Sequence, residues 1–177
     1  MNVLLCSLSD SLNNPSRLHA AIVHMPIAIA LLGFVLVVAL ALTRGRSSTL
    51  RTIALVLYLL GAVSGFMAGR SGEAAEDFST QRTTLSTEAD ETLEKHEDMG
   101  KKAWLFLAGS MLAVGLTAIN RPVLRGTFVV IALVVSLSAA GWVTLTGHLG
   151  GELVYEHGIG VPASTNNIPA TTQPASS

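Results

Sequence analysis

The chain has 177 residues, of which 50% are hydrophobic and only 13% are charged. Soluble domains carry about 25% charged residues, so this composition indicates a membrane protein. The formal net charge of −1 disfavours nucleic-acid binding, and the single cysteine, Cys6, excludes an intramolecular disulfide and a covalent haem motif.

The N-terminal segment, residues 1–16, carries no basic residue before its short apolar patch. A secretory signal needs a positive start and a longer apolar run, so this segment is predicted to be extramembrane. The domain that follows covers 17–161. After it, residues 162–177 consist mainly of Ala, Ser, Thr, Asn and Pro, which predicts a disordered tail.

Four apolar windows lie within the domain, each near the roughly 20 residues that a helix needs to cross the hydrocarbon core. They cover about 20–42, 52–69, 103–120 and 126–148. Each window is apolar on every helical face, unlike a helix that meets water on one side. The sequence therefore predicts an all-α polytopic membrane protein, folded as an antiparallel four-helix transmembrane bundle.

The connections between the windows are unequal. Residues 71–102 form a long polar loop, in which Thr87 and Asp90 resemble a capping box. This pattern predicts a helix that starts near Thr87 and continues into the third span. At the end of the fourth window, the pair Gly150-Gly151 is typical of a helix end.

The two short connections carry basic residues and no acid: Arg44, Arg46, Arg51, Arg121 and Arg125. The positive-inside rule places such loops in the cytoplasm. We therefore expect a multi-pass protein of the bacterial cytoplasmic (inner) membrane. Both termini and the 71–102 loop are then expected outside.

With this topology all five histidines lie at the outer face: His19, His24, His96, His148 and His157. His19 and His24 are five residues apart, about 140° around a helix, so both cannot point inward from one regular helix. The faces shared with apolar and small residues favour His24, His96 and His148, from three helices, as the cofactor-binding set. The set predicted for a metal is wider: His19, His24, His96, Glu97, His148 and Glu152.

Imidazoles at this depth suit several kinds of site. They ligate haem iron, coordinate Zn or Cu, or exchange protons near neutral pH. Histidines at helix ends also serve as plain hydrogen-bonding groups, and this structural interpretation stays open beside the others.

Three motifs occur in order along the chain. They are Arg17–Ile27 with its two histidines, Glu94–Gly100 with its His-Glu pair, and Gly147–Val161 with its Gly-Gly-Glu-Leu-Val-Tyr run. Together they resemble an uncharacterised bacterial family of membrane proteins, domain of unknown function 2231. Ala20 departs from the family's usual proline, and Met25 from its usual phenylalanine.

The resemblance implies a four-helix membrane domain and no established activity. It draws attention to five places: His19, His24, His96, Glu97 and the segment Gly150–Tyr155.

The leading hypothesis is a b-type haem or metal-binding electron-transfer module that works with membrane or periplasmic protein partners. One alternative is an accessory subunit, with a glycine ridge at Gly61, Gly65 and Gly69 packing within or between chains. Another is a small proton-linked transporter, which would require a homo-oligomer. An enzyme is disfavoured, because the sequence has no nucleophile elbow, phosphate loop or His-Glu-x-x-His motif.

Overall fold

The computed structural model describes residues 13–80 and 85–160. Every regular element in these ranges is a helix: α2 (Pro15–Ile22), α3 (His24–Leu42), α4 (Ser48–Thr80), α5 (Thr87–Leu116) and α6 (Pro122–Tyr155). The predicted all-α class is therefore confirmed. Residues 1–12 of the predicted N-terminal segment, and the predicted disordered tail, lie outside the described residues.

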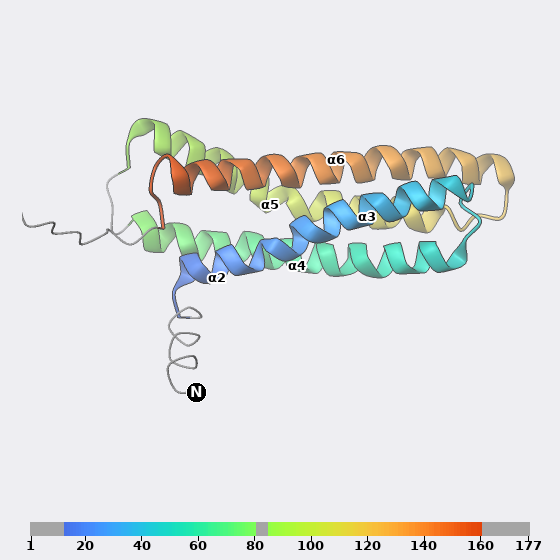
Figure 1. Cartoon of the computed structure of the whole chain (residues 1–177), viewed down its shortest axis with the longest axis horizontal. Coiled ribbons are helices and arrows are strands. Elements are labelled where there is room, and N and C mark those ends of the chain that lie inside the picture. The colour runs from blue at the N-terminus through green and yellow to red at the C-terminus, as the bar shows by residue number, and fades with distance from the viewer. Residues whose placement is uncertain (1–12, 81–84, 161–177) are drawn as a thin grey trace, which may run out of the picture.

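The helices form a bundle in which consecutive rods run in opposite directions (Figure 1). α2 and α3 together make the first rod. α3 packs on α4 and α6, and α5 packs on the same two helices, so each rod contacts two neighbours. The rods enclose a buried apolar core that includes Val37, Leu40 and Leu107. We call the end of the bundle where α2 begins and α6 ends the histidine end, because His19 and His96 lie there.

The outer surface of the bundle is apolar. Many large aliphatic and aromatic side chains on it are exposed, among them Leu32, Val35, Val63, Phe66 and Val134. In water such a surface would aggregate, whereas hydrocarbon solvates it. Three helical segments are also long and apolar enough to cross a membrane: Pro15–Leu42, Ser48–Phe78 and Pro122–Tyr155.

α5 is not among those three segments. It begins as the sequence predicts, at Thr87, but its cap is Ser86, whose hydroxyl accepts a hydrogen bond from the Ala89 N–H at 3.2 Å. The helix ends at Leu116, before the predicted end of the span at residue 120, and two lysines precede its apolar half. The apolar half of α5 is short, which explains why α5 is not among the helices long and apolar enough to cross a membrane. That α5 crosses the membrane stays a prediction.

The first rod has a one-residue irregularity at Val23, between α2 and α3, where the backbone stays helical and the Val23 N–H still bonds to the His19 carbonyl at 3.1 Å. Pro26 lies three residues later and is buried in the first turn of α3. Because proline has no N–H, it cannot bond to the carbonyl of Ile22, and an uninterrupted helix is not favoured here. α2 continues the line of α3 and packs on α4.

The glycine ridge of α4 lies inside the chain. A Cβ on Gly61 would come within 2.7 Å of Ile29 Cγ2, and one on Gly65 within 3.4 Å of the Trp104 Cα. A Cβ on Gly69 would lie 3.7 Å from the Gly100 carbonyl oxygen. Small residues let helices approach closely in membranes, so this ridge brings α4 against α3 and α5. The ridge is occupied within the chain, which leaves it unsuited to dock a partner.

Arg51 joins the two short turns at the far end of the bundle. Its Nε donates to Thr117 Oγ1 at 2.9 Å, and its Nη2 donates to the Gly45 carbonyl at 2.6 Å and to the Thr117 carbonyl at 3.2 Å. Thr117 is fully buried, so these bonds satisfy polar groups that water cannot reach.

Replacing Arg51 by methionine is expected to lower the free energy of unfolding by about 1–3 kcal/mol, because buried acceptors lose a charged donor. Denaturation by SDS of the protein in detergent micelles measures this change. Arg46→Met is the matched control, since Arg46 is exposed and its side chain bonds to nothing in the described ranges. Equal stability of the two variants would show that Arg51 contributes nothing beyond its surface charge.

Candidate functional site

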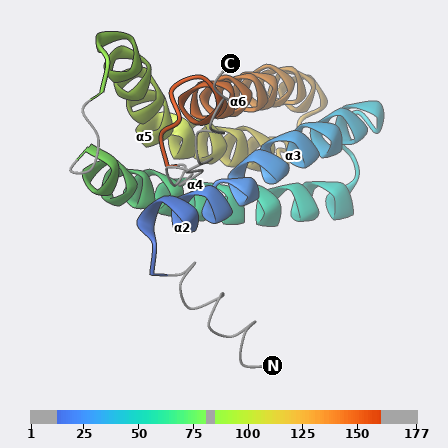
Figure 2. The same ribbon diagram turned by 60° about the vertical axis from the view of Figure 1, so that its left-hand side comes forward.

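A cavity of about 610 Å³ opens at the histidine end. Figure 2 turns this end forward, where α2, the end of α4, the start of α5 and the end of α6 meet. The volume of the cavity lies within the usual range of ligand pockets, about 300–1,000 Å³. Eight glycines line it, and they leave backbone open to close contact with a ligand: Gly65, Gly69, Gly72, Gly100, Gly147, Gly150, Gly151 and Gly160.

Two imidazole rings meet in this cavity. His19 of α2 and His96 of α5 both line it, and their ring centroids lie 6.2 Å apart with an interplanar angle of 85°. These residues are 77 positions apart in the sequence, so the packing of the bundle alone brings them together.

Hydrogen bonds fix the protonation pattern of both rings. His96 Nδ1 lies 2.9 Å from the Thr146 carbonyl, which only accepts, so this nitrogen carries the proton. His19 Nδ1 lies 3.0 Å from Ser71 Oγ, and that hydroxyl donates its own proton to the Ala68 carbonyl at 3.0 Å. Ser71 Oγ therefore accepts from His19 Nδ1.

Each ring is left with its lone pair on Nε2. Among the described residues, the bonds of these rings to Ser71 and Thr146 run through Nδ1, and the Ala68 carbonyl also bonds to His19. An imidazole that donates from Nδ1 to a protein oxygen, and presents Nε2, is the usual arrangement of a metal-ligating histidine. His96 has this form, and His19 has it when its Nδ1 carries the proton.

Two glycines make room for these rings. A Cβ on Gly150 would lie 2.9 Å from His96 Cε1, and one on Gly72 would lie 3.3 Å from His19 Cε1. Gly150 and Gly151 do not end the helix as their sequence suggests, because α6 continues to Tyr155. Glycine is needed at position 150 because the absence of a side chain there lets His96 lie against α6.

The other predicted ligands take different positions. His24 is exposed at the rim of the cavity, and its Nδ1 bonds to the Ala20 carbonyl at 2.6 Å. His148 is exposed, and Glu152 is half-buried outside the cavity lining. Glu97 lines the cavity. In the described ranges, no three residues among His, Cys, Asp and Glu are grouped to hold a metal ion.

The structure thus pairs His96 with His19, where the sequence favoured His24 and His148. The wider six-residue set predicted for zinc or copper is not assembled in the described part of the chain.

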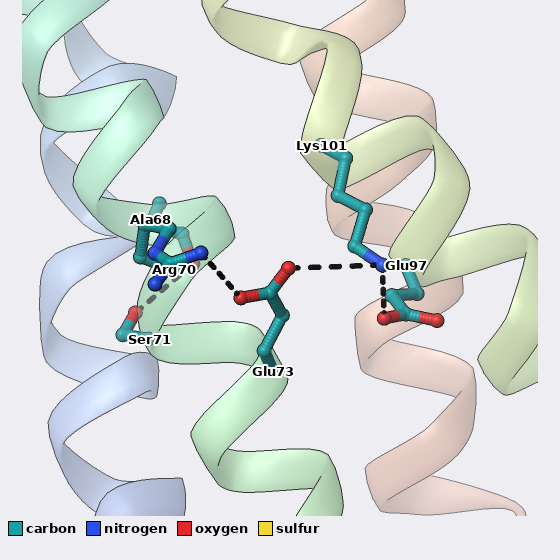
Figure 3. A network of polar contacts seen from close by, with 6 residues as sticks. All are labelled: Ala68, Arg70, Ser71, Glu73, Glu97 and Lys101. Atoms are coloured by element: carbon teal, nitrogen blue, oxygen red, sulfur yellow. Dashed lines mark hydrogen bonds and ion pairs between the residues drawn. The ribbon is translucent and has the colours of Figure 1, made fainter.

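Charged groups surround the mouth of the cavity between α4 and α5. Glu73 bonds to Arg70 at 3.1 Å and to Lys101 at 3.8 Å, and Lys101 also bonds to Glu97 at 2.5 Å (Figure 3). The Lys101 ammonium holds the pKa of Glu97 below its usual value, and Glu97 raises the pKa of Lys101 in return. These partly exposed pairs add little to stability but fix the charge pattern of the mouth.

Burial lowers the pKa of His96 below its usual value of 6.5, and the hydrogen bond to Thr146 opposes that shift in part. His96 is therefore neutral at neutral pH, as a ligand must be.

The ligand-free protein is expected to lose stability as the pH falls below 6.5, because the unfolded chain takes up a proton that folded His96 resists. Above 6.5 both states are neutral at this residue and the effect vanishes. Melting temperatures of the wild type and of His96→Gln, measured across this range, test the prediction. The variant should show the smaller decline, and parallel curves would contradict it.

The apolar outer surface and the three long apolar helices define an integral membrane protein. A family model described as "Predicted membrane protein (DUF2231)" matches residues 15–163, and the chain belongs to this family. The resemblance drawn from the three motifs is confirmed. No curated protein and no solved structure matches the chain.

Proposed function

We propose that this protein is a membrane-bound electron-transfer module that holds one b-type haem between His19 and His96. The observation that carries the proposal is the ring pair itself: two imidazoles whose centroids lie 6.2 Å apart in one cavity, each with Nδ1 bonded to a protein oxygen. Metal–imidazole bonds are about 2 Å long, so two nitrogens on one metal lie about 4 Å apart and their ring centres somewhat farther. A centroid separation of 6.2 Å supports this spacing, once both Nε2 atoms are turned toward the metal.

The donor set favours haem over a bare metal ion. Zinc in structural sites takes four protein ligands, and no group of even three is present in the described ranges. Haem iron is bound by four nitrogens of the porphyrin and needs only axial ligands from the protein. Here His19 of α2 and His96 of α5, whose rings meet, would supply them.

The shape and chemistry of the cavity also support haem. A porphyrin is broad, flat and largely apolar, and the cavity combines a glycine-rich wall with apolar side chains such as Ile27, Leu93, Val143 and Leu153. When bound, the haem would supply the one-electron chemistry. The protein would hold it, orient it and exclude water.

The proposed topology has four spans, with α5 as the fourth, although its apolar half is short. The lysines before it can extend to the headgroups while their stems stay in the apolar region. The arginine-rich turns then lie in the cytoplasm of a bacterial inner membrane, and the cavity opens on the outer side. A haem there would exchange electrons with partners outside the membrane.

A reduced-minus-oxidised optical spectrum tests the proposal directly. The protein is produced with ample haem, purified in mild detergent and analysed for iron, zinc and copper in the same sample. We expect the bands of a six-coordinate low-spin haem, with one iron per chain. A colourless, metal-free protein would refute the proposal, and stoichiometric zinc or copper without the bands would replace it with a metal site.

A further inference from the structure

Two cationic side chains line the cavity, Arg17 and Lys101. They differ in their surroundings. Lys101 is already paired with Glu97 and Glu73. Arg17 is exposed, and within residues 13–80 and 85–160 its guanidinium makes no ion pair. The cavity therefore has one cation whose charge the described protein does not neutralise.

The backbone places Arg17 at a defined position relative to the histidine pair. Asn14 caps α2, and its side-chain oxygen accepts from the N–H of Ser16 at 3.1 Å and of Arg17 at 3.3 Å. Pro15, at the first position of the helix, already has the helical φ angle. Arg17 thus lies in an ordered first turn of α2, and its side chain lines the cavity.

Acidic side chains also line the cavity, on α4 and α5. Glu76 of α4 and Glu97 of α5 both line the cavity, next to the network around Glu73. A ligand with an apolar body and an anionic edge would be repelled there and attracted toward the start of α2. Such a charge pattern determines orientation more than affinity.

We infer that Arg17 binds a carboxylate of the ligand that His19 and His96 hold, and so fixes which edge of the ligand faces the cavity mouth. The inference rests on the proposed function, and for haem b the carboxylate is a propionate. A guanidinium matches a carboxylate with two parallel N–H···O bonds, a geometry that lysine or glutamine cannot reproduce.

Two forms of one porphyrin separate this role from general packing. Haem b and its dimethyl ester share the iron and the ring, but the ester has no charged propionate. Each is titrated into ligand-free protein in dodecyl maltoside without added lipid, and the Soret band gives the dissociation constants. Three proteins are compared: the wild type, Arg17→Gln and the control Arg46→Gln. Arg46 is exposed and lies at the other end of the bundle.

The wild type and Arg46→Gln are expected to bind haem about tenfold more tightly than the ester, as one good charge-assisted contact implies. In Arg17→Gln this preference should fall to about one, because affinity for haem drops while affinity for the ester stays unchanged. Arg17→Lys should keep part of the preference, since it retains the charge without the fork.

The outcomes separate the two proposals. A wild type that binds neither compound refutes the haem site and this inference with it. A wild type that binds both compounds equally keeps the haem site but overturns the role of Arg17, as does a preference that survives in Arg17→Gln. If Arg17 instead binds lipid phosphate, no preference appears in lipid-free detergent, and the inference fails in the same way.

Discussion

The His19→Ala and His96→Ala variants are expected to lose the haem absorption bands, whereas His24→Ala and His148→Ala keep them. Each ring of the pair would supply one of the two ligands that the protein gives to the iron. Either substitution would therefore leave the iron with one protein ligand instead of two. Losing an oriented ligand should weaken haem binding by at least about a hundredfold, since even a group that only orients a ligand by a hydrogen bond is worth about 10–100-fold. Spectral titration of the purified variants measures this loss.

The exposed histidines provide the controls, because they belong to the same motifs but do not share the ring pair. His24 Nδ1 is hydrogen-bonded to the Ala20 carbonyl, and His148 is exposed on α6. Bands that vanish in His24→Ala and His148→Ala, yet persist in His19→Ala, would restore the three-helix site favoured by the sequence. Circular dichroism of each variant shows whether the helices remain folded.

A methyl group added at Gly33 is expected to destabilise the bundle more than a surface change does. A Cβ there would come within 2.7 Å of Tyr58 Cζ and 2.9 Å of its hydroxyl oxygen. Tyr58 is fully buried, so its ring has no free space to move into. Overpacking of this kind costs about 1–3 kcal/mol, and Gly33→Ala should lower the free energy of unfolding in detergent by that amount.

Gly141→Ala on α6 is the matched control. Its Cβ would meet nothing within 4 Å, so the change adds a methyl group to an open surface. Alanine is also the better helix former, and this variant should be neutral or slightly more stable. The double variant Gly33→Ala/Tyr58→Leu replaces the ring by a smaller side chain, so it should recover part of the lost free energy of unfolding. A Gly33→Ala protein as stable as Gly141→Ala would show that the close contact is absent in the membrane protein.

The helices were largely readable from composition and charge. Runs of aliphatic residues between charged islands predict helices wherever the environment is hydrocarbon, since backbone groups must then bond internally. The ends were harder to predict. α4 continues to Thr80, well past the window that ended at 69, because nothing in its polar continuation breaks a helix. Apolarity marks the membrane, but helix propensity and caps determine where a helix ends.

The site was predicted only in part, and the reason is local. The 140° separation correctly indicated that His19 and His24 point different ways, but sequence alone does not say which one faces inward. The packing of α2 on α4 decides this, because it brings His19 within hydrogen-bond distance of Ser71. One signal was available: a histidine that can reach a backbone carbonyl four residues earlier, as His24 reaches Ala20, is already satisfied.

The two histidines belong to different halves of the chain. His19 is tied to α4 through Ser71, inside the first helical hairpin, and His96 is tied to α6 through Thr146, inside the second. Membrane proteins assemble in two stages, with helices inserting before they associate. Each hairpin can therefore enter the bilayer with its own imidazole already oriented. Binding of the cofactor to both imidazoles would then hold the two hairpins together. It would therefore be a late step in the assembly of the protein.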